Sequence, residues 1–158
     1  MAELDHAAEI LQGVRVILET ELMQARGQRL LVRDLDAQAL FERARQRSVF
    51  NVQLAQLENE LAQTLEAAGK RLGLEQVTLD ELRRVAPRDA VKLESRLAEI
   101  RVLAEALREV DAVNRKLSER ALGRVRRVLS SMAPQTVAYD RRGAHQPMES
   151  LSTSCRMA

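Results

Sequence analysis

The segment from residue 88 to residue 132 contains no proline, and its apolar side chains recur at steps of three and four. That spacing is the period of one face of an α-helix. The resulting apolar stripe consists of Leu93, Leu97, Ile100, Ala104, Leu107, Val110, Asn114, Leu117, Ala121, Val125, Val128 and Met132. At 1.5 Å per residue, one helix over this segment would be about 65 Å long. The segment therefore predicts a fold built from long helices.

Aromatic side chains are scarce in the rest of the chain. The 158 residues include two Phe, one Tyr and no Trp, while charged residues make up 30%. Strands favour aromatic and β-branched residues, whereas this composition is typical of long helices and coiled coils. We therefore expect an all-α fold. A chain of this length has room for one domain with a real core.

Two more long helices precede that segment. The first is expected over about residues 3–33, where apolar residues again recur at helical spacing. Asp34 is a candidate N-cap for the second helix, expected over about 35–71. On the apolar face of that second helix lies Arg47, which either extends its head to solvent or pairs with a group on another helix. Gly73 can cap its end in the left-handed conformation.

A short helix is predicted over residues 79–85, between the second and third long helices. Thr78 and Glu81 have the spacing of a capping box, and Pro87 ends the helix. Residues 1–132, with helices at about 3–33, 35–71, 79–85 and 88–132, are therefore expected to form an elongated, antiparallel bundle. This bundle would have three long helices, coiled-coil-like crossing and one short connecting helix.

From Ala133 onward the helical period stops. Residues 133–158 contain Pro, Gly, Ser and Thr without periodicity and are expected to form a flexible tail. The tail holds the only tyrosine, Tyr139, and the only cysteine, Cys155. A single cysteine allows no internal disulfide and gives no indication of an oxidising compartment. With no signal peptide and no transmembrane span in the sequence, a cytoplasmic location and no membrane insertion are expected.

No pattern in the sequence indicates catalysis. His6 and His145 lie at opposite ends of the chain without a second metal ligand at suitable spacing, so both are interpreted as surface histidines. Cys155 has no fixed base beside it, and no glycine-rich phosphate loop occurs. We therefore expect no enzyme activity, no metal site and no cofactor.

Charge is distributed unevenly along the chain. Residues 1–113 carry 16 Lys and Arg against 20 Asp and Glu, and residues 114–158 carry nine against three. The basic end is either a solvated helix face or a site for an acidic partner, nucleic acid or anionic lipid. Nucleic acid is not the expected partner, because no aromatic or amide side chains alternate with the basic residues to read bases.

Binding is the remaining role for such a chain. The first two long helices would form a hairpin that is as long as, or shorter than, the helix over residues 88–132. The C-terminal half of the apolar stripe on that last helix could therefore remain uncovered. An uncovered apolar stripe normally has a partner, often another amphipathic helix.

The last helix and the tail together resemble a known family. The segment "LREVDAVNRKLSERALGRVRRVLSSM" (107–132), followed by "YDRRG" (139–143), resembles the FlgN-type flagellar export chaperones. The matching positions include Leu107, Arg108, Glu109, Asn114, Leu117, Tyr139 and Gly143. The order of the earlier helices is also similar, so the resemblance covers most of residues 4–143.

This resemblance implies a cytoplasmic chaperone of the flagellar type III secretion system. It would bind the terminal helical segments of hook-associated subunits, prevent their premature assembly and deliver them to the export gate. Arg124, Arg126 and Arg127 would form a polar rim. Tyr139 and Gly143 would dock on the cytoplasmic domain of the gate. The predicted subunit contacts are Leu107, Val110, Asn114, Leu117, Leu122, Val125, Leu129 and Met132.

An alternative interpretation needs no flagellar subunit. A generic coiled-coil adaptor or structural protein could form homo-oligomers through the same stripe. It predicts a stable homo-oligomer with no affinity for flagellar subunits. A homodimer of the free chain is compatible with either interpretation.

Overall fold

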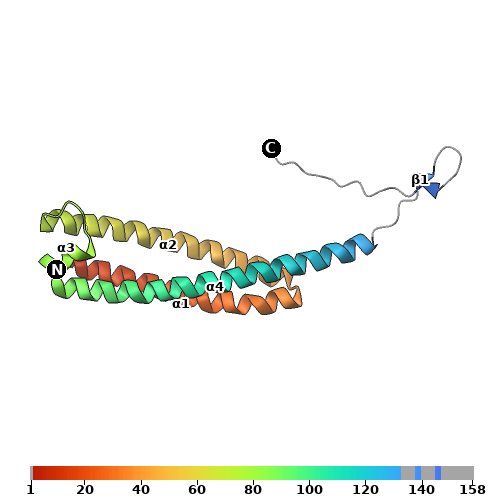
Figure 1. Cartoon of the computed structure of the whole chain (residues 1–158), viewed down its shortest axis with the longest axis horizontal. Coiled ribbons are helices and arrows are strands. Elements are labelled where there is room, and N and C mark those ends of the chain that lie inside the picture. The colour runs from red at the N-terminus through yellow and green to blue at the C-terminus, as the bar shows by residue number, and fades with distance from the viewer. Residues whose placement is uncertain (1, 133–137, 140–144, 147–158) are drawn as a thin grey trace. The chain divides into compact units, whose positions relative to one another are not determined.

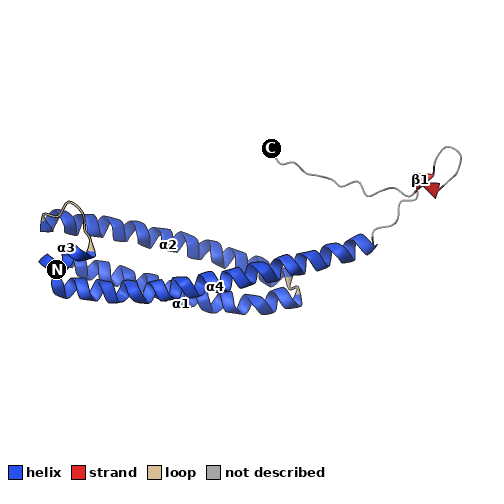
Figure 2. Ribbon diagram, in the orientation of Figure 1, coloured by secondary structure: helices blue, strands red, loops and turns tan. Residues whose placement is uncertain are grey.

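Long helices dominate the fold of this chain. The computed structural model describes residues 2–132, 138–139 and 145–146 (Figures 1 and 2). Within these ranges the elements are α1 (Ala2–Asp34), α2 (Ala37–Leu72), α3 (Leu79–Val85), α4 (Pro87–Met132), β1 (Ala138–Tyr139) and β2 (His145–Gln146). The predicted all-α bundle of three long helices and one short helix is confirmed. The chain forms two units, residues 1–121 and residues 122–158, and α4 contributes to both.

The turn between α1 and α2 differs from the prediction by two residues. Asp34 is the last residue of α1, so its predicted role as N-cap is wrong. Leu35 takes the left-handed conformation with φ 54°, and the amide of Asp36 then donates to the Leu31 carbonyl at 3.1 Å. This left-handed residue and hydrogen bond cap the C-terminal end of α1. The chain therefore reverses later, and the Asp36 carboxylate caps α2 by accepting from the amide of Ala39 at 2.9 Å.

The ends of α2 and α3 follow the predicted signals. Gly73 has φ 70° and caps α2 in the left-handed conformation. Thr78 and Glu81 form the reciprocal capping box of α3. Pro87 is the first residue of α4, a position where its missing amide hydrogen costs nothing. The sequence predicted these boundaries because each depends on local chemistry.

Cross-helix contacts fix the directions of the long helices in residues 1–121. Arg71 pairs with Glu3 and Arg43 with Glu21, so α2 runs antiparallel to α1. Lys92 pairs with Asp5, and Asn114 bonds to Ala25, so α4 runs parallel to α1. Hence α4 is antiparallel to α2, and Figure 1 shows the three helices side by side.

The core of residues 1–121 consists of two apolar clusters. The end cluster joins all four helices and contains Leu4, Ala7, Ala8, Leu11, Ala68, Leu82, Ala90 and Leu93. The middle cluster contains Val14, Leu18, Leu22, Ala25, Phe50, Leu107 and Val110. Helix α1 supplies about half of the buried residues in each. Their removal from water is the main stabilising contribution to the bundle.

Beyond α4 the structure describes one short pair of strands. β1 and β2 are antiparallel, with Ala138 opposite Gln146 and Tyr139 opposite His145. The sequence predicted no regular structure in this region, so the pair was not anticipated. Residues 133–137, 140–144 and 147–158, which include Gly143 and Cys155, lie outside the described residues.

Candidate functional site on helix α4

Helix α4 changes from buried to exposed along its length. Its buried apolar residues are Ala90, Leu93, Leu107, Val110 and Ala121. From residue 122 to residue 132 no side chain is buried. Along this stretch the exposed fractions are 50% for Leu122, 36% for Val125, 56% for Val128, 61% for Leu129 and 73% for Met132. The spacing of these five residues places them on one face, and we call them the apolar row.

The predicted subunit contacts differ in their exposure to solvent. Leu107 and Val110 belong to the middle cluster and Asn114 is also buried, so these three lie inside the bundle. Leu117 is half-buried. The other four are exposed members of the apolar row. In this structure these four are the predicted contacts most exposed to a partner.

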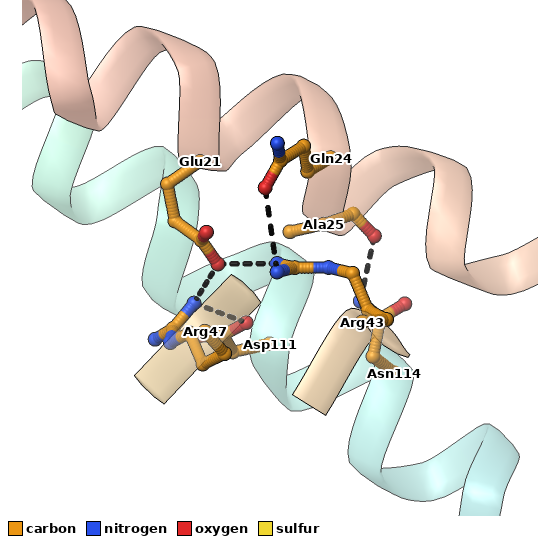
Figure 3. A network of polar contacts seen from close by, with 7 residues as sticks. All are labelled: Glu21, Gln24, Ala25, Arg43, Arg47, Asp111 and Asn114. Atoms are coloured by element: carbon orange, nitrogen blue, oxygen red, sulfur yellow. Dashed lines mark hydrogen bonds and ion pairs between the residues drawn. The ribbon is translucent and has the colours of Figure 1, made fainter. Parts of the chain in front are cut away.

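A polar layer crosses the bundle next to the middle cluster. Its centre is Glu21 of α1, whose side chain is 1% exposed and which accepts from both Arg43 and Arg47 of α2 (Figure 3). Arg43 is itself buried, while Arg47 is one-third exposed and reaches Asp111 of α4 at 2.7 Å. The layer therefore connects all three long helices through charge-assisted hydrogen bonds.

Arg47 is the member of this layer that the sequence pattern placed on the apolar face of the second helix. Of the two predicted alternatives, pairing across helices is the one observed. Burial lowers the pKa of Arg47, but its hydrogen bond to Glu21 and the charges of Asp111 and Glu21 outweigh burial and hold the pKa above its ordinary value. Its guanidinium also lies 5.3 Å from the centre of the Phe50 ring, within range of a cation–π contact.

Asn114 completes the layer on the α4 side. Its Nδ2 donates to the backbone carbonyl of Ala25 at 2.8 Å (Figure 3). Its buried Oδ1 has no hydrogen-bond partner among the described residues. A single buried amide at a core position fixes the register of packed helices at some cost in stability. In the bundle Asn114 therefore holds α4 against α1.

Sequence reasoning missed Glu21 and Arg43. Glu21 lies beside Leu18 and Leu22 on the apolar face of α1, and Arg43 lies one turn before Arg47 on α2. A carboxylate on one apolar face and two arginines four residues apart on the next were the available signal. The pairing of Glu21 with these arginines could be recognised only once the antiparallel register of α1 and α2 was known.

Basic side chains lie along the apolar row. Arg124 is four residues before Val128, and Arg126 is four residues after Leu122, so the two arginines border opposite edges of the row. Both are exposed, and neither forms an ion pair with any residue that the structure describes.

Among the side chains that the structure describes, the remaining candidate groups form no reactive cluster. His6 of α1 is half-exposed, and its Nε2 lies 3.1 Å from Oε1 of Glu60 of α2, so this contact links two helices at the surface. Among the described residues, no group of three or more His, Cys, Asp or Glu is placed to hold a metal ion. No described helix combines the length and apolar character that crossing a bilayer requires.

Comparison with protein families identifies the chain. The model of the FlgN protein family matches residues 4–147, which include all four helices and the Tyr139–Gly143 element. The chain belongs to the FlgN family. FlgN proteins are flagellar export chaperones and not known enzymes, and in general they bind flagellar hook-associated proteins. The resemblance found in the sequence is thereby confirmed.

No curated protein and no solved structure gave a significant match to the chain. The family assignment therefore rests on the match to the FlgN family and on the helical architecture.

Proposed function

We propose that this chain is a cytoplasmic chaperone that binds hook-associated flagellar subunits through the apolar row of α4 and delivers them to the export gate. The observation that carries the proposal is the exposure of Leu122, Val125, Leu129 and Met132 on one helix face in a member of the FlgN family. A cytoplasmic location follows from the proposed role, because subunits are held there before export.

The apolar row suits a helical client. The terminal segment of a subunit that is helical only in the assembled filament carries an apolar face, and covering that face prevents premature assembly. Two amphipathic helices bury such faces by packing side chains at helical spacing into one another. Leu107, Val110 and Asn114 stay predicted contacts, and they would meet a client only if α4 separated from α1.

The second part of the proposal concerns Tyr139 and Gly143. In this role Tyr139 inserts its ring into a pocket on the cytoplasmic domain of the gate. A tyrosine contributes a large contact area while only two side-chain torsions are fixed on binding. The support is the FlgN match, which extends through both residues.

Titration of the purified chain with hook-associated subunits tests the first part. Size-exclusion chromatography with light scattering should show a stable heterocomplex that is lost when the terminal helical segment of the subunit is deleted. If no subunit forms a complex and the chain is a tight homodimer, the generic coiled-coil alternative is correct instead.

Paired variants localise the contact. Leu122→Ala with Leu129→Ala should weaken the complex by about tenfold to 100-fold, because buried anchor residues dominate interfaces. The matched control is Val91→Ala with Val102→Ala, which truncates two exposed α4 valines outside the apolar row. The control should bind normally. Equal loss in both double variants would contradict the assignment of the site.

The gate contact has its own test. Tyr139→Ala should leave subunit binding unchanged and weaken binding of the chaperone–subunit complex to the isolated cytoplasmic domain of the gate. Tyr139→Phe keeps the ring and should retain most of that binding. If the Ala variant also lost the subunit, the assignment of Tyr139 to gate docking would be wrong.

A further inference from the structure

The charge on α4 is one-sided in its C-terminal part. Residues 115–127 carry six basic residues and one acidic residue, Glu119. Arg120, Arg124 and Arg127 follow each other at steps of four and three and therefore lie along the same side of the helix. Arg126 lies on the other side of the apolar row. An apolar face with cations on both sides is the most distinctive exposed surface among the described residues.

Most basic residues in 1–113, in contrast, form ion pairs within the chain. Of the 16 Lys and Arg in residues 1–113, ten form an ion pair with another described residue. None of the six basic residues in 115–127 pairs with a described residue. The ten paired residues are Arg15, Arg33, Arg43, Arg45, Arg47, Lys70, Arg71, Arg83, Lys92 and Arg96.

We propose that the client segment that covers the apolar row is an amphipathic helix whose apolar face is bordered by carboxylates. This inference rests on the proposed chaperone function and specifies the chemistry of the client. When such a helix packs on the row, its acidic borders lie beside Arg124 on one edge and Arg126 on the other. Complementary charges at the rim raise the association rate and reject helices with basic borders.

A second copy of this chain is a poor occupant of the same surface. Two apolar rows packed on each other would bring Arg124 and Arg126 of one copy near the same basic borders of the other. Like charges at a helix interface are destabilising. The basic borders therefore favour a different, acidic helix over self-association.

A membrane surface is also less suitable than an acidic helix. Helices that lie in the lipid interface typically carry Trp, Phe or Leu on the buried face. Of these three residue types the apolar row has only leucine, at Leu122 and Leu129, and residues 115–132 contain no aromatic side chain. The row is also short, about 15 Å from Leu122 to Met132 at 1.5 Å per residue.

Synthetic peptides test the inference directly. Three helical peptides of equal length share one leucine face, and their borders carry Glu, Gln or Lys. Full-length chain should bind the Glu peptide at least tenfold more tightly than the Gln peptide, and the Lys peptide most weakly. The preference should disappear at about 1 M salt, where the screening length is only about 3 Å. Equal affinity for all three peptides overturns the inference.

Charge-reversal variants show where the preference arises. Arg124→Glu with Arg126→Glu should invert the order, so that the Lys peptide binds best. The matched control is Arg88→Glu with Arg101→Glu, which makes the same charge change at exposed α4 arginines that form no ion pair with described residues. The control should keep the original order. Circular dichroism verifies that both variants retain their helical content.

Two further results separate the possible failures. If hook-associated subunits bind but the peptides show no charge preference, the inference is wrong and the proposed function stands. If no subunit binds while the Glu peptide does, the surface chemistry is correct and the proposed client is wrong. Tighter binding to vesicles of phosphatidylcholine with phosphatidylglycerol than to the Glu peptide would overturn the inference in favour of lipid.

Discussion

Helix α4 contains two stretches with the same apolar periodicity and opposite surroundings. Between Ala90 and Asn114 its apolar face is buried against α1 and α2, and Lys92 and Asp111 pair with other helices. Between Leu122 and Met132 the same kind of face is exposed and its arginines have no described partner. We refer to these as the covered stretch and the exposed stretch.

The comparison shows that an apolar stripe alone does not distinguish a core from an interface. Both stretches have leucine and valine at steps of three and four, so their hydrophobic patterns are equivalent. Charge makes the distinction, because the covered stretch has complementary groups among the described residues and the exposed stretch has none there.

Removal of the buried carboxylate should have the largest effect. Glu21→Ala leaves Arg43 buried without its counter-ion and should lower the free energy of unfolding by about 3–5 kcal/mol. Urea denaturation followed by circular dichroism measures the loss. The double variant Glu21→Leu with Arg43→Leu removes both charges and should recover most of the stability. If the single variant is as stable as the parent, the layer does not hold the covered stretch in place.

Truncating one leucine in each stretch tests the comparison directly. Leu93→Ala opens a cavity in the end cluster and should cost about 2–4 kcal/mol of unfolding free energy. Leu129→Ala removes an exposed side chain and should change stability by no more than about 0.5 kcal/mol. Chemical denaturation of both variants provides the test. A large loss for Leu129→Ala would show that the exposed stretch is packed in the free chain.

Local signals in the sequence predicted the fold well. The capping box at Thr78, the left-handed cap at Gly73 and the periods of the long helices determine where each element lies. The N-cap was misplaced at Asp34 because Leu35, rather than a glycine or asparagine, adopts the left-handed turn conformation. Sequence patterns rarely identify such a position, since leucine pays a steric cost there.

The candidate site was predicted less completely. The stripe was found, but which half of it is covered depends on the lengths and the register of α1 and α2. Leu107 and Val110 were predicted as subunit contacts without that knowledge, and the structure places both in the middle cluster. Glu21 and Arg43 were missed because their pairing is formed between helices.

Substitution of Asn114 should have a moderate effect. Asn114→Ala removes the hydrogen bond to the Ala25 carbonyl and should cost about 1 kcal/mol. Asn114→Leu also removes the unpaired Oδ1 and fills the volume, so its cost should be smaller, with looser register of α4 as the consequence. Thermal unfolding and hydrogen exchange along α4 measure both. Asn51→Ala, at an exposed asparagine of α2, is the control. Unchanged stability in Asn114→Ala together with weaker subunit binding would assign Asn114 to the client.

Acid should weaken the covered stretch more than the exposed one. A hydrogen bond from Lys92, together with its charge, holds the pKa of Asp5 below its ordinary value. Because the folded pKa is depressed, this pair stabilises the bundle fully above about pH 4, the unfolded pKa of aspartate. The stabilisation is lost as the pH falls through the folded pKa.

Two variants isolate that contribution. Between pH 6 and strongly acidic solution, the Asp5→Asn variant should lose less stability than the parent. This effect should be smaller than those of the Glu21, Leu93 and Asn114 substitutions, because the Asp5 and Lys92 side chains are half-exposed. Arg124→Gln should respond to acid as the parent does, since Arg124 has no described carboxylate partner. Denaturation midpoints across this pH range provide the measurement. An altered acid response in Arg124→Gln would mean that the exposed stretch is paired in solution, and the contrast between the two stretches would then lose its electrostatic basis.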